Sequence, residues 1–282
     1  MNQGIRKYKF FRNPFSYLIK AMVIAAAILT SAIIIFIIGY ITANGLPHLK
    51  ASMFAWKYTS ENASMMPAII NTLIIVLVAL IIAVPFGVGA AIYLTEYSKR
   101  GSRFVKVVRV TTETLSGIPS IIFGLFGRIF FVVALGWGYS VLASSMTLAI
   151  MVLPLILRTT EEALLAIPDT YREGSFGLGA GKLRTVFKVI LPSALPAILS
   201  GIILATGRIV GETAVLIFTA GAVAKVTTGL FSSGRTLAVH MYNLANEGLY
   251  LNEAYATAFF MLIFVALLNL LSTIIVNKAK KI

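Results

Sequence analysis

Six long apolar segments constrain the fold more than any other feature of this sequence. They lie near residues 20–43, 68–95, 111–135, 140–157, 196–221 and 254–277. Each is close to the roughly 20 helical residues that cross a hydrocarbon core of about 30 Å. Only 12% of the residues are charged and 59% are hydrophobic, a balance that cannot cover a water-exposed globular surface. The sequence therefore predicts an all-α integral membrane protein with six transmembrane helices in a lipid bilayer.

The basic residues predict how the chain is oriented. Most of the 24 Lys and Arg residues fall at the two termini and in the loops after the second and fourth segments. The other loops carry only Lys50, Lys57, Lys225 and Arg235, so the positive-inside rule puts both termini in the cytoplasm. The formal net charge of +14 does not indicate nucleic acid, because the basic clusters lack an interleaved aromatic face.

The predicted domain organisation follows from these segments. Residues 1–19 form a basic cytoplasmic segment, and residues 20–43 form the first transmembrane helix. That helix is too long for a signal-peptide core and lacks a convincing cleavage site. Residues 65–277 form the core domain, which includes a cytoplasmic loop at residues 158–192. The span at 140–157 has the weakest pattern, and its prediction depends partly on the charges requiring an even number of crossings.

The cytoplasmic loop predicts a helix-turn-helix. Pro168 suits a first helical turn, and Gly179 suits the left-handed residue that ends a helix. These two residues predict a short helix over 168–178. A second helix over 182–190 is expected to stop before Pro192.

Nucleotide and metal sites are not expected in this chain. The segment "GAGKL" resembles the end of a phosphate-binding loop, but Phe176 and Leu183 stand where that motif needs Gly and Ser or Thr. The sequence has no cysteine. His240 is expected to be a polar residue at the outer membrane interface, because no carboxylate or second histidine stands at metal-site spacing.

The loop resembles the cytoplasmic signature of the membrane subunits of bacterial ABC importers. That signature is Glu-Ala-Ala, three residues, Gly, nine residues and Ile-x-Leu-Pro. The matching positions are Glu173, Gly174, Ser175, Gly179, Val189, Leu191 and Pro192. Gly-Ser replaces Ala-Ala, and Val replaces Ile. The resemblance implies that residues 168–181 form a coupling helix that sits in a groove of an ATPase subunit.

Three further stretches are similar to the PstA-type permeases of the phosphate importer. They are "GIPSIIFGLFG", "LPSALPAILSGIILATGRIVGETAVLIFTAG" and "AYATAFFMLIFVALLNLL", and the similarity covers residues 65–275. It implies a type I ABC-importer permease fold in the inner membrane of a bacterium or archaeon, forming half of a pathway for inorganic phosphate. The implied partners are a second related permease, a dimer of ATPase subunits that carries ATP and Mg, and an extracytoplasmic phosphate-binding protein. Val215 stands where this family usually has proline, so the shape of the helix beyond Glu212 stays open.

Arg208 and Glu212 are two charged residues inside the predicted fifth membrane span, where charge is costly. A fifth span that starts near Pro196 puts them about 18 and 24 Å along the helix, so they should face the bundle interior. In one interpretation they neutralise each other as an i, i+4 pair, with Gly207 and Gly211 letting a neighbouring helix pack closely. In the other, Arg208 helps to carry an oxyanion, and Glu212 accepts the proton that phosphate keeps at neutral pH and sulfate does not.

Arg128 is a weaker candidate for the substrate pathway. It lies roughly 25 Å along the third span, where an arginine side chain can snorkel to the outer surface. Snorkelling is the favoured interpretation, and attraction of anions at the outer surface is the second.

Other functions remain as alternatives to a phosphate permease. The cargo could be another oxyanion such as sulfate, molybdate or phosphonate. A stand-alone anion transporter is disfavoured, because inverted repeats and broken helices are not evident in the sequence and the signature loop would have no use. A membrane-embedded enzyme is disfavoured because Asp169 is the single aspartate and both histidines lie outside the predicted spans.

Overall fold

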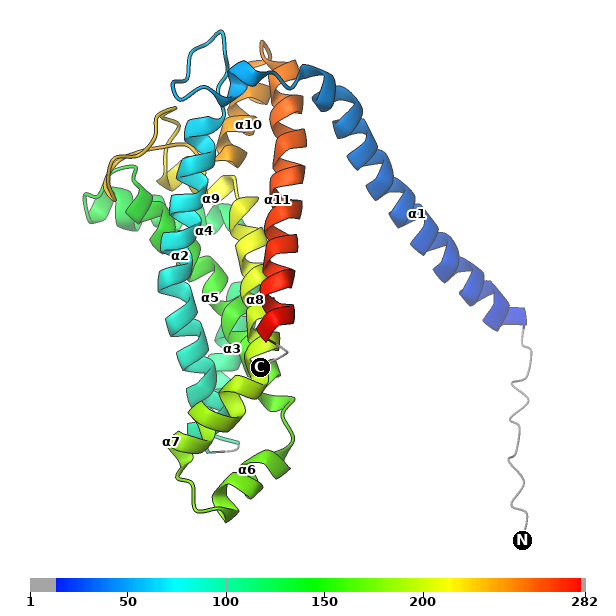
Figure 1. Ribbon diagram of the computed structural model, residues 1–282, viewed down its shortest axis with the longest axis vertical. Helices are drawn as coiled ribbons and strands as arrows, with labels where there is room; N and C mark the ends of the chain where they lie inside the picture. The colour runs from blue at the N-terminus through cyan, green and yellow to red at the C-terminus, as the bar shows by residue number, and fades with distance from the viewer. Residues whose placement is uncertain (1–13, 100, 280–282) are drawn as a thin grey trace.

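The computed structural model describes residues 14–99 and 101–279, so residues 1–13 of the predicted cytoplasmic segment lie outside the described residues. Within the described part, every regular element is helical, and Figure 1 shows a bundle of long helices with α1 apart from it. Five helical runs are long and apolar enough to cross a membrane by length and composition. They are α1 (Pro14–Gly45), α2 (Met66–Ile92) with its π-helical end η3 (Tyr93–Tyr97), α5 (Val141–Leu165), the continuous α7 (Lys182–Thr185), η5 (Val186–Ile190) and α8 (Leu191–Val210), and α11 (Leu251–Ala279).

The third apolar segment, which is expected to form one span over residues 111–135, is sharply bent. It consists of α3 (Arg103–Ser116), α4 (Ser120–Gly127) and the π-helical η4 (Arg128–Ala134), with a bend of 98° between α3 and the helical run that follows. Pro119 causes the break, because it lacks a backbone N–H and has an extended ψ of 140°. If the bent pair counts as one span, the described chain has six candidate spans.

The fifth segment also differs from the sequence prediction, at both ends. The helix expected to stop before Pro192 runs on without interruption to Val210. The π-helical turn explains this, because the N–H of Leu191 bonds to the carbonyl of Val186 and the widened turn accommodates the next residue, proline. Beyond Val210 the helix breaks, and the short helix α9 (Ala214–Thr219) follows.

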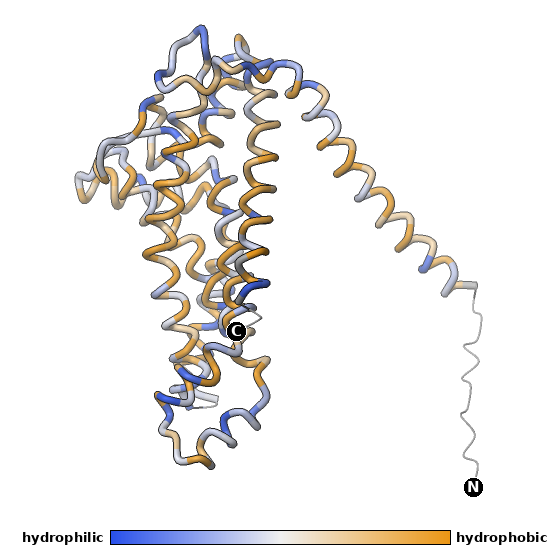
Figure 2. The backbone as a smooth tube through the Cα atoms, in the orientation of Figure 1, coloured by the Kyte–Doolittle hydropathy of each residue, from blue (hydrophilic) through white to orange (hydrophobic). Residues whose placement is uncertain are grey.

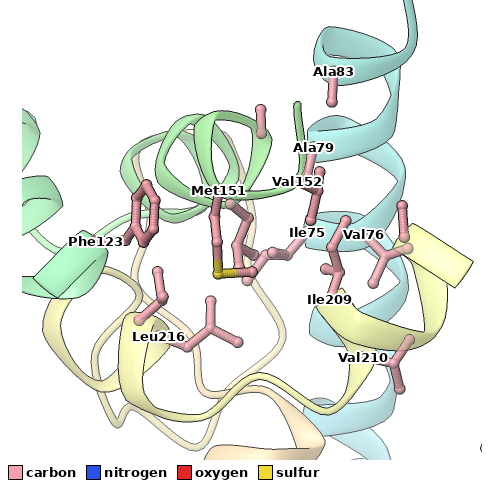
Figure 3. Packing of buried hydrophobic residues seen from close by; sticks show 14 of the residues in the cluster. Ile75, Val76, Ala79, Ala83, Phe123, Met151, Val152, Ile209, Val210 and Leu216 are labelled. Atoms are coloured by element: carbon pink, nitrogen blue, oxygen red, sulfur yellow. The ribbon is translucent and has the colours of Figure 1, made fainter. Parts of the chain in front are cut away.

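The largest buried cluster joins α2, α5, α8, α4 and α9. Figure 3 shows side chains from these helices meeting in one apolar layer: Ile75, Val76, Ala79, Ala83, Phe123, Met151, Val152, Ile209, Val210 and Leu216. Small residues allow the helices to approach. At Gly201 of α8, a Cβ atom would lie 2.7 Å from the Cβ of Thr159 in α5. The two backbones are therefore close enough there to exclude any larger residue.

Helix α1 contacts the bundle only near its C-terminal end. There the ring of Tyr40 packs edge-on against Tyr255 of α11, with 5.9 Å between centroids. The apolar stretch of α1 buries nothing against the rest of the chain, and Figure 2 shows that it is hydrophobic along most of its length. The described chain thus leaves a long apolar helix without a protein partner.

The end of the bundle opposite the 158–192 loop is capped by α10 (Leu237–Glu247) and by the segment that holds η1 (Leu46–His48) and η2 (Ala51–Phe54). His240 of α10 is 0% exposed, so the expectation of an interfacial polar residue is wrong. Its ring packs edge-on against Tyr58, and the guanidinium carbon of Arg235 lies 4.3 Å from the centroid of the same tyrosine ring. Burial, and secondly the charge of Arg235, lower the pKa of His240 to about 3.

The buried histidine predicts a loss of stability in acid. Between pH 6.5 and about pH 3 the unfolded chain protonates this imidazole and the native chain does not. The free energy of unfolding should therefore fall by about 1.4 kcal/mol for each pH unit lost in that window. Thermal unfolding of the detergent-solubilised chain between pH 7 and 4 measures this slope. His240→Phe should flatten it and His48→Phe should not; equal slopes in the parent and His240→Phe would contradict the prediction.

Candidate functional site

The 158–192 loop presents a short exposed helix, α6 (Asp169–Gly177), at one end of the bundle. It begins after Pro168, which has an extended ψ of 142° and therefore stands just before the helix rather than in its first turn. Gly179 has a φ of +79°, the left-handed conformation that its position predicts. The N–H of Ala180 bonds to the carbonyl of Ser175 and closes the helix end.

The surface of α6 is almost entirely open. None of its residues is buried, and Glu173 and Gly174 are both exposed. Leu178, just past its end, is 91% exposed. A groove of about 620 Å³ lies between α6 and the start of the following helix, lined by Thr170, Tyr171, Gly174, Ser175, Leu178, Gly179, Ala180, Arg184, Lys188 and Val189. The groove thus combines two basic residues with exposed apolar side chains, and Glu173 is exposed on the same helix.

Ser175 ties α6 to the next helix. Its hydroxyl lies 2.8 Å from the hydroxyl of Thr185, which also donates to the carbonyl of Gly181. Thr185 is buried although its neighbours on α7 are exposed. This pair fixes the distance between the two short helices.

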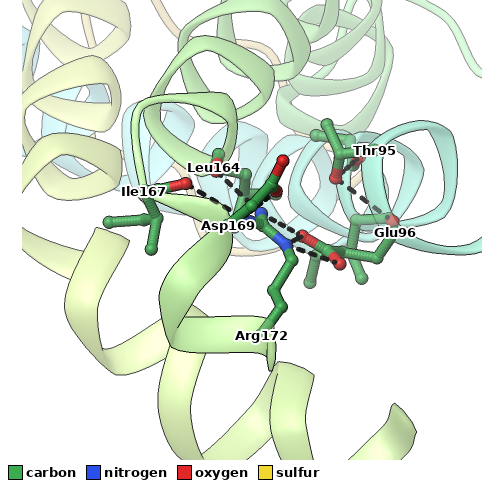
Figure 4. A network of polar contacts seen from close by, with 8 residues as sticks. Thr95, Glu96, Leu164, Ile167, Asp169 and Arg172 are labelled. Atoms are coloured by element: carbon green, nitrogen blue, oxygen red, sulfur yellow. Dashed lines mark hydrogen bonds and ion pairs between the residues drawn. The ribbon is translucent and has the colours of Figure 1, made fainter. Parts of the chain in front are cut away.

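Arg172 ties the other end of α6 to the bundle, as Figure 4 shows. Its Nη2 lies 2.6 Å from Oε1 of Glu96, and its other bonds reach the carbonyls of Leu164 and Ile167. Hydrogen bonding to Glu96 raises the pKa of Arg172 above its usual value, against the opposing effect of burial. Neither residue is among the predicted site residues. The sequence pattern that could have indicated this ion pair is the single acidic residue Glu96 at the end of the second span together with the single basic residue Arg172 near the start of the loop helix.

Leu191 and Pro192 lie within the continuous helix, not at a helix end. Leu191 is half-buried and packs against the apolar cluster formed by the ends of α2, α5 and α8. Pro192 is exposed. Leu191 and Pro192, the last two residues of the signature, are therefore part of the continuous helix that joins the loop to the membrane core.

Arg208 and Glu212 do not form the predicted pair. Arg208 lies in the last turn of α8, where the helix dipole favours a cation, and its side chain is exposed without a hydrogen bond or ion pair among the described residues. Glu212 lies past the helix end, and its Oε1 accepts a bond from the N–H of Val215 at 3.3 Å. The chain does not continue as one helix from Arg208 to Glu212, so i, i+4 geometry is lost.

The close helix packing expected at Gly207 and Gly211 is also absent from the described chain. A Cβ atom added at Gly207 would meet nothing within 4 Å, and one at Gly211 would meet only the carbonyl of Gly207. Close packing occurs instead at Gly124 of α4, where a Cβ would lie 3.0 Å from the backbone of Val215 in α9. The two helices that follow the breaks in the third and fifth segments are therefore packed against each other.

Arg128 begins the π-helical segment η4 and is exposed. Its guanidinium carbon lies 5.8 Å from the centroid of the Tyr139 ring, within the range of a cation–π contact. Snorkelling and anion attraction both stay predictions for this residue.

The described residues offer no obvious metal centre. No group of three or more His, Asp or Glu side chains in this part of the chain is placed to hold a metal ion. The groups that the structure presents are an exposed helix, α6, and a guanidinium on α8 that has no partner among the described residues.

Comparison with known proteins identifies relatives over most of the chain. The family model described as "binding-protein-dependent transport system inner membrane component" matches residues 83–279. A Bacillus subtilis protein named as a probable ABC transporter permease is 33% identical over 242 residues, which are 79% of this chain and 81% of that protein. The phosphate transport system permease protein PstA of Haemophilus influenzae is 30% identical over 287 residues, 99% of each chain.

Solved structures share the fold. A chain in the crystal structure of a bacterial alginate ABC transporter, in complex with an alginate pentasaccharide-bound periplasmic protein, superposes with a TM-score of 0.61. The match covers 94% of this chain and 96% of that chain at 15% identity. At that identity the likeness concerns the fold alone.

Proposed function

Because this chain belongs to the family of binding-protein-dependent transport system inner membrane components, we propose that it is the permease subunit of an ATP-driven phosphate importer and forms half of its pathway. The observation that carries this proposal is the 30% identity to the Haemophilus influenzae phosphate permease over 99% of both chains. Apolar spans and family membership make it a multi-pass inner-membrane protein. Both termini lie in the cytoplasm of a bacterium or archaeon in this proposal, as the basic loops require.

ATP hydrolysis belongs to a separate dimer of subunits that bind ATP and Mg, and this chain binds no cofactor of its own. The exposed helix α6 supports this assignment, because Glu173, Gly174, Ser175 and Gly179 present a surface that the rest of the chain leaves open. The signature spacing is that of a coupling helix. Leu191 and Pro192 lie on the continuous helix over residues 182–210, which transmits movement of the loop to the membrane core. Two relatives are named as permease proteins, which agrees with a transport role.

A second, related permease completes the pathway. Helix α1 supports this, because its apolar stretch is exposed and buries nothing within this chain, so its side chains can pack against another subunit. An extracytoplasmic phosphate-binding protein delivers the cargo from outside. The alginate transporter structure, which contains a ligand-bound periplasmic protein, is a precedent for that kind of partner.

Phosphate recognition within the membrane involves Arg208. Its guanidinium is exposed on the bundle surface and has no partner among the described residues, so its donors are free for a tetrahedral oxyanion. Glu212 is half-buried just beyond it, and its carboxylate accepts a hydrogen bond from the protonated oxygen that phosphate has and sulfate lacks. Arg128 has a minor role in attracting anions.

Two alternatives compete with this proposal. Sulfate, molybdate or phosphonate would use the same guanidinium, so only competition assays separate them from phosphate. A stand-alone anion transporter gains support from the helix breaks at residues 117–119 and 211–213. The family model and the exposed coupling helix favour the importer.

Replacing Arg208 tests the proposed pathway. Arg208→Gln should lower phosphate uptake about tenfold at equal membrane abundance, because one charge-assisted contact to the anion is lost. Glu212→Gln should reduce the preference for phosphate over sulfate. Uptake of labelled phosphate, with sulfate, molybdate and phosphonate as competitors, measures both effects. Arg158→Gln, which removes an exposed arginine at the far end of α5, is the matched control; parent-like uptake in Arg208→Gln would refute the role.

A further inference from the structure

Helix α6 is held in place by polar contacts and not by an apolar core. It has no buried residue, so hydrophobic packing cannot fix its direction. Two of its polar contacts reach other helices: the hydroxyl pair of Ser175 and Thr185 at one end, and the guanidinium of Arg172 at the other. A push on α6 can reach the membrane helices only through such contacts or through the connecting chain.

Every nitrogen of Arg172 has an acceptor. Nε lies 3.2 and 3.3 Å from the two carboxylate oxygens of Glu96, and Nη2 lies 2.6 Å from the first of them. Nη2 also donates to the carbonyl of Leu164 at 3.1 Å, and Nη1 to that of Ile167 at 2.9 Å and to Oδ1 of Asp169 at 3.2 Å. One side chain therefore joins η3, the C-terminal end of α5 and the first turn of α6 (Figure 4).

Burial distinguishes this ion pair from the nearby pair of Arg158 and Glu162. The side chains of Arg172 and Glu96 are 16% and 7% exposed, whereas those of Arg158 and Glu162 are 61% and 63% exposed. Exposed pairs contribute little because water screens them. A desolvated pair with a planar fork of donors holds a fixed geometry, and loss of one partner leaves the other charge buried and unpaired.

The end of α2 receives contacts from both short helices of the loop. Glu96 accepts from Arg172 of α6, and Tyr97, the next residue, lies under the ammonium of Lys182 with 5.1 Å from Nζ to the ring centroid. Both residues belong to the π-helical turn η3, which continues directly from the membrane helix α2. Helix α2 in turn packs against α5 through the central cluster.

We propose that Arg172 and Glu96 are the positioning residues that transmit movement of α6 to α2 and α5, so that ATP hydrolysis on a partner is coupled to opening of the pathway. This role rests on the proposed permease function. When the ion pair of Arg172 and Glu96 is removed, α6 still moves with the ATPase, but this movement no longer displaces η3. Hydrolysis then continues, and transport for each ATP consumed falls. No chemistry occurs at the pair, because it acts only through geometry.

The anchoring step is measured on the full chain alone, in lipid nanodiscs. Hydrogen exchange of the α6 amides should rise about fivefold in Arg172→Gln and in Glu96→Gln, because the helix loses its fixed attachment. Arg158→Gln removes an arginine from the exposed pair nearby and should leave α6 exchange at the parent value. Unchanged α6 exchange in Arg172→Gln and Glu96→Gln would overturn the proposal without any need for the assembled transporter.

The coupling step is measured in proteoliposomes that contain the assembled importer, as phosphate moved per ATP hydrolysed. This ratio should fall about fivefold in Arg172→Gln and Glu96→Gln, within the usual range of coupling energies between sites. Arg172→Lys keeps the charge without the fork and should fall between these variants and the parent, while Arg158→Gln should match the parent. Equal losses of uptake and hydrolysis at an unchanged ratio would show a merely structural role and refute the proposal. If the parent chain itself fails to assemble with ATPase subunits, the proposed function is wrong instead.

Discussion

Replacing Gly179 with valine is expected to weaken binding of the ATPase subunits about a hundredfold and to stop phosphate uptake with it. The residue has a φ of +79°, where a β-branched side chain costs roughly 1–2 kcal/mol. The same side chain would stand in the exposed surface at the end of α6 and obstruct a close partner, at a similar further cost. Together these terms correspond to about two orders of magnitude in affinity. Co-purification of the tagged chain with the ATPase subunits, followed by titration, measures the loss.

Gly174 provides the matched control on the same helix. Its φ lies outside the left-handed region, and a Cβ added there meets nothing within 4 Å. Gly174→Ala should therefore leave ATPase binding intact and stabilise α6 by up to about 1 kcal/mol through helix propensity. If Gly179→Val binds as tightly as Gly174→Ala, this surface is not where the ATPase docks.

Replacing Gly201 with valine should destabilise the membrane core by about 3 kcal/mol or more. A Cβ at this position would lie 2.7 Å from the Cβ of Thr159, an atom fixed to the α5 backbone. The side chain of Thr159 also donates to the carbonyl of Leu155, so it cannot turn away freely. The helices must separate instead, and overpacking of this kind costs 1–3 kcal/mol for even small insertions, about 3 or more when a backbone must shift.

Gly207 lies on the same helix and serves as the control that separates the contact with Thr159 from the effect of valine on the helix. Nothing stands within 4 Å of a Cβ at that position, so Gly207→Val should unfold within about 0.5 kcal/mol of the parent. Urea or thermal unfolding in detergent measures both variants. A similar loss of stability at the two glycines would mean that valine disturbs α8 itself and not its contact with α5.

The apolar runs were sufficient to predict the helical membrane fold, because hydrophobic length is a property of the segment alone. The loop helix was predicted for the same reason, since Pro168 and Gly179 act on their own backbone. Pro119 predicts a kink in the third span, because proline lacks a backbone N–H, but neither the 98° size of that bend nor the break after Val210 was predicted. Pro119 breaks a span, whereas the helix continues through Pro192, and the difference is the π-helical turn that precedes Pro192.

The contacts of the charged and polar side chains were also not predicted correctly. Arg208 and Glu212 are spaced as a helical pair, but the helix ends between them. Arg172 and Glu96 are 76 positions apart and have no periodic relation, although they form the most buried ion pair in the described chain that involves α6. His240 is buried because a separate segment covers α10, which its own neighbours do not indicate. Such features arise from tertiary packing, which a single sequence does not encode in a readable pattern.

The absence of buried residues in α6 has a consequence for how this surface changes over generations. Substitutions at exposed positions usually alter stability by less than about 0.5 kcal/mol, so the residues of α6 can vary without weakening the membrane core. In the proposed importer, these residues can therefore change along with the surface of the ATPase subunit. Gly174, which replaces an alanine of the family signature, is an exposed substitution of this kind. By the same reasoning, the interior contacts of Arg172 should be the slowest to change in this loop.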